Sequence, residues 1–574
     1  MRHSKIVLTL LVAAAAVTLL AQGRGGSQRT AQKFTVFETS IPELQAALKD
    51  GRTTSKEIVI QYLTRIAMYE DKVNATLAVN PNAIAEAEQL DRERAQGRLR
   101  GPLHGIPIAL KDNIHTTNMP TTGGALAFSG YVPPYEATLT KNLKDGGAII
   151  IAKTGLTELA NWVAGAPNPM PGNYNAVGGF GYNPYDPRMD PREANFDGRP
   201  VLATGGSSSG IGTAVSFWAG NVGSDTGGSI ISPSNSNMLV GIRPTIGRIS
   251  RYGVIPITAD HDTAGPMTRF VADAAIMLGV LESPSPDPND AATRTCTPPP
   301  NRDYTPFLKA DGLKGKRIGI PRAFYYDAVT LPGESQARGG VNAEQAKAMA
   351  EAINILKQQG AIVVDPADVP SFVDKDPKLN FPLWDYCSGG DQAKGKDAGC
   401  SVNFKYGMKR DFNAWLASLG PSAPLKSLTA LREWNLAHVR AGAIKFGQSR
   451  LDISDEMDLE KDRARNEEDV KKDQLLSRAN GIDGVLKAHN LDAILTPGGA
   501  GAGLAARAGY PIIVVPFALV PNGNPQAFPQ GFNPKPAPFG VGFTGAACSE
   551  TKLIEMAYGF EKASHKRVPP PNFP

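Results

Sequence analysis

From Gly101 onward, short apolar runs alternate with stretches of helical character, and this alternation constrains the fold more than any other feature of the chain. Each run has four or five residues and is bounded by glycine-rich turns, which is typical of strands buried on both faces of a sheet. The runs lie at residues 106–110, 148–152, 254–257, 493–496, 512–515 and 540–543. The pattern predicts an α/β protein with helices on both faces of its sheet.

Helices are predicted before the first of these strands and after the last. Residues 40–43 and 54–57 each place a hydroxyl side chain three positions before a glutamate, which is the capping-box signature of a helix start. We expect a third helix at 82–96 and a closing helix at 550–562. The second helix is expected to bury the apolar residues Ile58, Ile60, Tyr62, Leu63, Ile66 and Met68.

The composition allows a sizeable globular core, since 41% of the 574 residues are hydrophobic and 20% are charged. The 60 basic and 55 acidic side chains are spread along the chain, without the Lys/Arg block that marks a nucleic-acid surface. Nucleic acid is therefore not expected as a partner. We expect one large domain at 36–568, with surface excursions at 166–203 and 283–302, a helical segment at 385–475 and a Pro-rich tail at 569–574.

The N-terminus has the pattern of a secretory signal. Arg2 and Lys5 precede an apolar run at 6–20, and small residues follow where a signal peptidase would cut. The run is shorter than the ~20 residues that span a bilayer. We therefore expect a signal peptide at 1–23, a polar tail at 24–35, a periplasmic or secreted location, and no stable membrane insertion after cleavage.

Four cysteines follow the predicted signal, at positions 296, 387, 400 and 548. In an oxidising compartment Cys387 and Cys400 could close a short loop between them, and four unrelated thiols are the alternative. The spacing and the available ligand types do not indicate a zinc site.

The segment at 204–230 carries the strongest chemical signal, because it holds two Gly-Gly-Ser turns separated by a run of small residues. Glycine permits backbone conformations that aim several N–H groups at one point, and such a cluster stabilises an oxyanion. A serine beside it is a candidate nucleophile. Flexible loops are the alternative interpretation, whereas a phosphate-binding loop is disfavoured because GxxxxGK[ST] is absent.

A second interpretation of the same segment uses the string at 206–210, which satisfies G-x-S-x-G. That motif would make Ser208 the nucleophile of an α/β-hydrolase-type esterase, with an Asp and then a His later in the chain. Histidines at 438, 489 and 565 are candidates for the catalytic histidine, so the order of the motifs alone leaves this alternative open.

Lys111 ends the apolar run at 106–110 and is the candidate base. A lysine at a strand end usually lies along the surface with its ammonium in water. If the side chain is buried instead, loss of solvation lowers its pKa and creates an amine that can accept a proton from a hydroxyl.

Many separate motifs, in order, resemble those of the amidase signature family over residues 36–568. They include PLHGIPIALKDNI at 102–114, TGGSSSG at 204–210, GSDTGGSI at 223–230 and DTAGPMTR at 262–269. The resemblance implies the amidase signature fold, with a central mixed, mostly parallel sheet flanked on both faces by helices. It also implies hydrolysis of a small-molecule amide without a metal or an organic cofactor.

The resemblance further implies a Ser-cisSer-Lys triad. Ser229 matches the nucleophile, Ser207 the bridging serine and Lys111 the base. The 22 residues from Ser207 to Ser229 are fewer than the family pattern has, so the intervening helix or its turn must be trimmed. Ser208 becomes a supporting hydrogen-bonding residue, and the oxyanion hole falls on the backbone N–H groups of Thr226, Gly227, Gly228 and Ser229.

Other functions and the choice of substrate remain open at this point. An ammonia-generating component of a tRNA-dependent amidotransferase would need cytosolic partners, which an export signal contradicts, and a non-catalytic binding protein would not need all three triad residues. A monomer and a homodimer are both compatible with the sequence. Candidate specificity residues lie in the 166–203 loop and in the 380–450 region, where aromatic side chains suggest an apolar or aryl acyl or amine group and ordinary core packing is the alternative. They are Tyr174, Asn175, Phe180, Tyr182, Trp384, Tyr386, Phe404, Tyr406 and Trp415.

Overall fold

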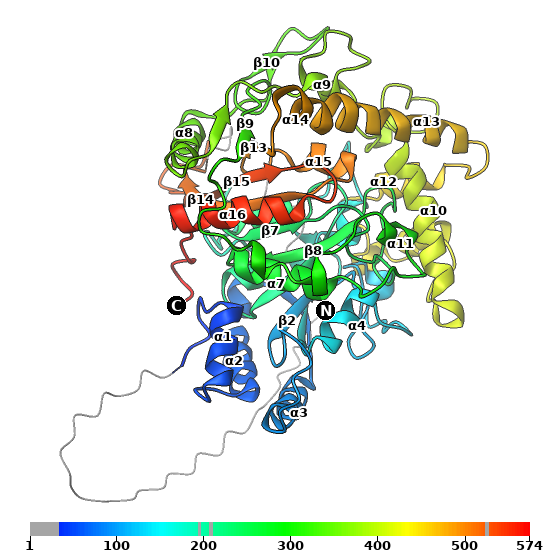
Figure 1. The fold of residues 1–574 in the computed structure, drawn as a ribbon. Helices are drawn as coiled ribbons and strands as arrows, with labels where there is room; N and C mark the ends of the chain where they lie inside the picture. Colours follow the sequence, from blue (N-terminus) through cyan, green and yellow to red (C-terminus); the bar gives the residue numbers. More distant parts are fainter. Residues whose placement is uncertain (1–33, 193–196, 206–209, 523–526) are drawn as a thin grey trace, which may run out of the picture. The chain divides into compact units, whose positions relative to one another are not determined.

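The computed structural model describes residues 34–192, 197–205, 210–522 and 527–574, and its centre is a large β-sheet (Figure 1). Residues 36–574 form one compact unit. The predicted signal peptide, Ser207 and Ser208 lie outside the described residues.

Eleven strands of the described chain form the central sheet. Parallel pairs form two blocks, β3-β2-β6 and β13-β9-β12, and all other neighbours pair antiparallel. The predicted mixed sheet is confirmed, with a smaller parallel share than expected because β7, β8, β14 and β15 alternate in direction. From edge to edge the strands are β1 (Thr76–Val79), β3 (Ile149–Thr154), β2 (Pro107–Lys111), β6 (Gly220–Asp225), β8 (Thr263–Thr268), β7 (Val240–Arg243), β14 (Ile512–Val520), β15 (Ala537–Thr544), β13 (Ala493–Pro497), β9 (Arg317–Gly319) and β12 (Ile362–Val364).

Two small hairpins accompany the central sheet. They pair β4 (Tyr174–Asn175) with β5 (Gly179–Phe180), and β10 (Val329–Thr330) with β11 (Ala337–Arg338). The first lies in the predicted surface excursion at 166–203.

Five of the six predicted strands are confirmed, and every residue of β2, β3 and β6 is buried, as expected for strands covered on both faces. The prediction of a strand at 254–257 is wrong. This run makes a single bridge, from Val254 to Ile114. Pro256 lacks a backbone N–H, which opposes continued pairing along the run.

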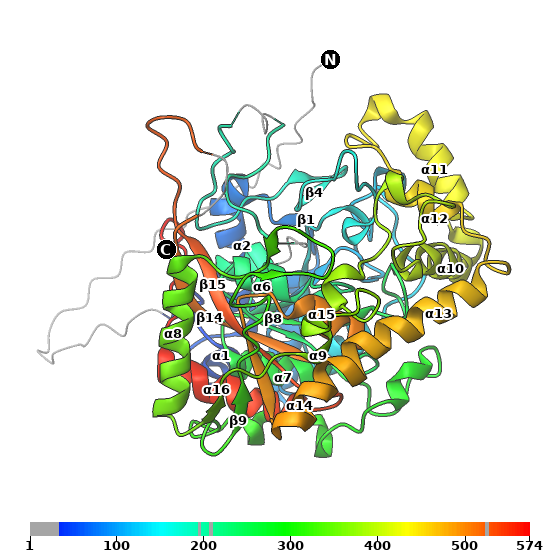
Figure 2. The ribbon, with the colours of Figure 1, turned by 90° about the horizontal axis from the view of Figure 1, so that it is seen from above.

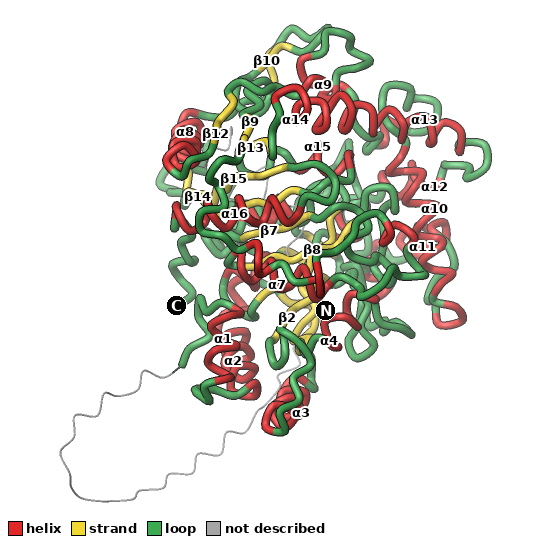
Figure 3. The backbone as a smooth tube through the Cα atoms, in the orientation of Figure 1, coloured by secondary structure: helices red, strands yellow, loops and turns green. Residues whose placement is uncertain are grey.

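Helices surround the sheet (Figure 3). They are α1 (Ile41–Lys49), α2 (Ser55–Val73), α3 (Ala83–Ala95), α4 (Thr138–Asp145), α5 (Gly210–Ala214), α6 (Ile231–Ser236), α7 (Val271–Leu281), α8 (Ala343–Gln358), α9 (Pro370–Val373), α10 (Asn403–Ser418), α11 (Leu428–Ala437), α12 (Ser449–Asp455), α13 (Arg463–Gln474), α14 (Asp483–His489), α15 (Ala502–Ala508) and α16 (Glu550–Ser564). A π-helical stretch at Leu475–Ile482 joins α13 to α14. None of the helices in the described ranges has both the length and the apolar character needed to cross a membrane.

The two faces of the sheet are covered by different helices (Figure 2). Ile512 and Val514 of β14 pack in one cluster with residues of α6 and α15. Phe543 of β15 pairs with Ile513 and contacts Phe560 of α16. Because successive side chains of a strand point to opposite faces, α16 covers the face opposite α6 and α15.

The capping boxes predicted at the starts of α1 and α2 are both formed. The buried face predicted for α2 is correct only in part. Ile58 and Tyr62 are fully buried, whereas Ile60 is 41% and Met68 55% exposed. A helical turn of 3.6 residues places these two side chains on the outer face.

The structure contains two disulfides. The bond between Cys387 and Cys400, one of the two possibilities that the sequence left open, is present and lies shortly before α10 in the chain. The second bond, which was not predicted, joins Cys296 to Cys548 across 252 residues.

Candidate active site

The second Gly-Gly-Ser turn follows β6 and is wrapped around the carboxylate of Asp225, the last residue of that strand. Asp225 Oδ1 accepts a hydrogen bond from the backbone N–H of Gly228 at 2.8 Å, and Oδ2 accepts one from Ile230 at 2.7 Å. Gly228 has a φ of 123°, a conformation that favours glycine. These contacts hold Ser229 at the turn, directly before α6.

Arg243, at the end of β7, balances the charge of Asp225. Its Nη1 lies 2.9 Å from Asp225 Oδ1, and both side chains are fully buried. The same nitrogen donates to the Asp225 carbonyl, and Nη2 donates to the carbonyl of His261 at 2.9 Å. The ion pair and these hydrogen bonds tie the turn to β7, while Arg243 Nε is buried without a hydrogen-bond partner among the described residues.

Lys111 is the last residue of β2, which pairs in parallel with β6, and its side chain is fully buried. Lys111 Nζ donates to the hydroxyl of Ser224 at 3.0 Å and to the Ser224 carbonyl at 3.3 Å. Asn113 Nδ2 also donates to the Ser224 hydroxyl, at 2.9 Å. The lysine is therefore tied to β6, the strand that leads into the turn with Ser229.

Burial lowers the pKa of Lys111 from 10.5 to about 8, and the carboxylates of Asp225 and Asp262 oppose part of this shift. Burial also raises the pKa of Asp262 to about 7. Asp262 accepts hydrogen bonds from Thr226 Oγ1 and, at 2.9 Å, from the backbone N–H of Ile257. At pH 7 about one tenth of Lys111 is thus the uncharged amine that can accept a proton, whereas a solvated lysine has well under 0.1% in this form.

A cavity of about 670 Å³ opens in front of the turn. Residues 226–229 form part of its lining, together with aromatic side chains from distant parts of the chain. The aromatic lining consists of Trp162, Phe324, Tyr325, Phe372, Phe381, Trp384, Tyr386 and Phe404. Charged side chains, including Arg450, Arg507 and Asp385, also line it. A cavity that combines aromatic walls with a few convergent polar groups is a usual form of a small-molecule site.

Three of the aromatic residues expected from the sequence, Trp384, Tyr386 and Phe404, line this cavity. Others have core roles. Tyr174, Phe180 and Trp415 belong to a buried cluster around α10, and Tyr406 packs beside the Cys387–Cys400 disulfide.

The structure brings Thr226, Gly227, Gly228 and Ser229 together at the cavity and places Lys111 beside β6. The N–H of Gly228 points to Asp225, so this predicted oxyanion donor is already engaged. The helix between the two serine turns is α5, which has five residues in the described part of the chain.

Sequence reasoning missed four residues that support the site, namely Ser224, Asp225, Arg243 and Asp262. Ser224 and Asp225 stand inside the motif GSDTGGSI, so position in that motif was the available signal. In the described ranges, no three His, Cys, Asp or Glu side chains gather so that they could hold a metal ion.

Comparison with known proteins places these features in a family. The Amidase family model matches residues 57–382. The chain is 31% identical over 563 residues to a probable amidase of Arabidopsis thaliana, covering 96% of this chain and 95% of that protein. It is 37% identical over 331 residues to the A subunit of the glutamyl-tRNA(Gln) amidotransferase from Chloroflexus aurantiacus, covering 57% of this chain and 60% of that protein.

Among solved structures, the fold is similar to native peptide amidase from Stenotrophomonas maltophilia. The TM-score is 0.75 at 33% identity, and the match covers 93% of this chain and 98% of the other. An amidase family protein from Bacillus anthracis gives a TM-score of 0.74 at 28% identity, covering 93% and 92% of the two chains. The chain belongs to the amidase signature family, as its motifs predicted, and is an amide-hydrolysing enzyme.

Proposed function

We propose that this enzyme cleaves the C–N bond of a small carboxylic amide through an acyl-enzyme on Ser229. The observation that carries the proposal is the burial of Lys111, whose amine has a pKa of about 8 and is bonded to the strand that leads into the Ser229 turn. A buried lysine of this kind is a base, whereas a solvated lysine is not.

In the proposed mechanism, uncharged Lys111 accepts a proton from Ser207 as Ser207 accepts one from Ser229. The Ser229 oxygen attacks the amide carbonyl, and the same relay returns a proton to the departing nitrogen. Ammonia or an amine leaves. Water, activated by the relay, then attacks the ester and releases the carboxylic acid. Ser207 lies outside the described residues, so its place in the relay rests on the family motif.

The oxyanion of the tetrahedral intermediate is proposed to bind the backbone N–H groups of Thr226, Gly227 and Ser229. Gly228 is omitted because its N–H is engaged by Asp225. The Asp225–Arg243 pair orients these donors before the substrate arrives, and donors fixed in advance stabilise developing charge most effectively.

We also propose that the enzyme is exported to the periplasm or the medium. Support comes from the signal pattern at 1–23 and from two disulfides, Cys296–Cys548 and Cys387–Cys400, because such bonds persist in oxidising compartments. N-terminal sequencing of the protein recovered from the periplasm or medium should begin after residue 23. Recovery only from the cytosol, with the N-terminus intact, would refute export.

The catalytic proposal can be tested with a fluorophosphonate probe and a panel of amides that includes a dipeptide amide, benzamide, an anilide and propionamide. Wild-type protein should take the label and release acid from at least one amide. Ser229→Ala should abolish both, while Ser208→Ala should still take the label.

Labelling that survives Ser229→Ala but disappears in Ser208→Ala would instead support the esterase alternative. A folded wild-type protein without label or hydrolysis would refute the proposed function.

A further inference from the structure

One wall of the cavity is formed by residues 384–388, a segment with little regular backbone structure. Trp384, Asp385, Tyr386 and Ser388 of this segment line the cavity. Its described backbone pairing is a single bridge between Tyr386 and Ser401. A segment of this kind depends on other contacts for its position.

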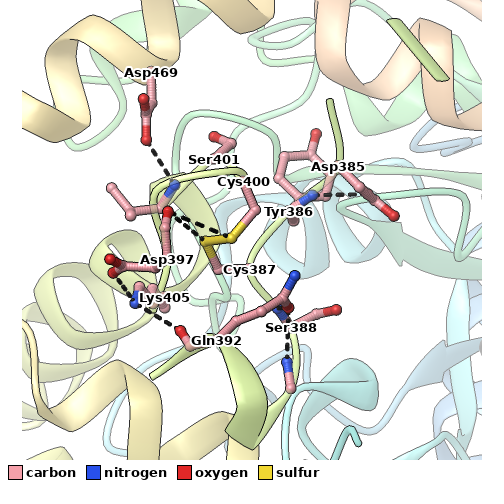
Figure 4. Close-up of a disulfide and its surroundings, with 12 residues drawn as sticks. Asp385, Tyr386, Cys387, Ser388, Gln392, Asp397, Cys400, Ser401, Lys405 and Asp469 are labelled. Carbon is pink, nitrogen blue, oxygen red and sulfur yellow. Dashed lines mark hydrogen bonds and ion pairs between the residues drawn. A yellow bond between two sulfur atoms is a disulfide. The ribbon is translucent and has the colours of Figure 1, made fainter. Parts of the chain in front are cut away.

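The Cys387–Cys400 disulfide supplies one such contact (Figure 4). Two backbone hydrogen bonds accompany it, from Cys387 N–H to the Ser401 carbonyl at 2.9 Å and from Ser401 N–H to the Asp385 carbonyl at 2.8 Å. The cavity wall is thereby covalently linked to the segment around Ser401.

That second segment is itself anchored to α13. The Ser401 hydroxyl donates to Asp473 Oδ2 at 2.8 Å, and the N–H of Val402 donates to Asp469 Oδ2 at 2.9 Å. The disulfide therefore connects the wall of the cavity to a helix outside it.

Tyr386 is the residue that this connection positions. Its ring centroid lies 3.9 Å from that of Phe404, and the guanidinium carbon of Arg507 lies 4.2 Å from the centre of the same ring. Arg507 Nε also donates to the Tyr386 hydroxyl at 3.1 Å. The charge of buried Arg507 is balanced by Asp385 at 3.5 Å and Asp473 at 3.8 Å.

We propose that Tyr386 determines the specificity of the enzyme for amides that carry an aryl group, and that Arg507 and the Cys387–Cys400 disulfide are its positioning elements. The inference rests on the proposed amidase function. A ring that lines the cavity and is held by a cation and a second ring offers a fixed aromatic contact to a planar substrate group. A small aliphatic amide makes little use of that contact.

The test compares steady-state kinetics for the best aryl amide and the best short aliphatic amide of the panel. Tyr386→Ala should raise KM for the aryl amide by about 2- to 10-fold, the fold-change of one aromatic contact, with little effect on the aliphatic amide. Tyr386→Phe keeps the ring and should retain most of the preference.

The paired variant Cys387→Ser/Cys400→Ser should also raise KM for the aryl amide while leaving the labelling rate of Ser229 unchanged. Its matched control is Cys296→Ser/Cys548→Ser, which removes a disulfide that has no cysteine in the wall segment 384–388. The control should leave KM for both amides at the wild-type value.

The inference would be overturned if Tyr386→Ala left the aryl-to-aliphatic ratio of kcat/KM unchanged, or if both disulfide variants shifted it equally. Wild-type enzyme that hydrolyses aliphatic amides but no aryl amide would also overturn it, with the proposed function intact. Wild-type protein that neither takes the label nor hydrolyses an amide would refute the proposed function, and this inference with it.

Discussion

Substitution of Lys111 by methionine should abolish labelling by the fluorophosphonate and, at the same time, make the protein more stable. Methionine has a similar length and no charge, so it fills the same buried site without the loss of solvation that the ammonium suffers. The increase in stability is the informative part, because a lysine with only a structural role would stabilise the fold.

The magnitude follows from the pKa. The pKa of Lys111 falls from 10.5 to about 8 in the folded protein. A tenfold change in acidity corresponds to about 1.4 kcal/mol, so burial of this group costs about 3 kcal/mol at pH 7. Lys111→Met avoids this cost but loses the hydrogen bonds to Ser224, which stabilise the folded protein by about 1.5 kcal/mol. We expect Lys111→Met to be more stable by about 1–2 kcal/mol.

The pH dependence gives a second check on the same variant. Between pH 8 and 10.5 the unfolded chain holds a proton on Lys111 that the folded protein has released. The free energy of unfolding of the wild type therefore rises with pH across this window, while Lys111→Met lacks this increase. The stability advantage of the variant at pH 7 is expected to narrow as the pH rises.

Thermal unfolding of both proteins at pH 7 and pH 9.5, beside the labelling assay, measures these effects. Lys153→Met is the matched control, because Lys153 is also fully buried at the end of the neighbouring strand but pairs with Asp112 at 3.0 Å. Leaving Asp112 unpaired should destabilise the protein by about 3–5 kcal/mol. A less stable Lys111→Met, or an unchanged pH dependence, would refute the reasoning.

Three further predictions concern the same site. The labelling rate of wild-type enzyme should rise with pH, reach half of its plateau near pH 8 and level off above about pH 9, as Lys111 loses its proton. A flat profile between pH 6 and 9 would contradict the assigned base. Gly228→Ala should distort the turn, because φ is 123° and the new methyl would lie 3.2 Å from Ala502. Displacement of a neighbouring oxyanion donor should lower the labelling rate by about 10²–10³-fold. Unchanged labelling would show that the turn tolerates the methyl. Asp225→Asn should lower the thermal midpoint and abolish labelling, since it removes the charge that Arg243 pairs with; a folded, labelled variant would disprove the orienting role of Asp225.

Local sequence patterns were sufficient for those elements that carry a strong local signal. Capping boxes predicted the starts of α1 and α2, and short apolar runs predicted five strands, because both signals act within a few residues. The prediction of a strand at 254–257 was wrong because apolar character does not reveal whether a neighbouring strand is present to pair with the run. The predicted burial of Ile60 and Met68 was wrong for a similar reason. An apolar side chain can remain exposed where nothing packs against its face of the helix.

The sequence by itself determined the family and the candidate residues Lys111 and Ser229, since ordered motifs carry that information in consecutive letters. Only the tertiary structure decided that Lys111 is buried and bonded to Ser224, 113 residues away, and that Arg507 holds Tyr386 across 121 residues. The physical reason is that solvation, and hence the pKa of an amine or the position of a ring, depends on every segment that packs around it. Those segments meet only when the whole chain has folded.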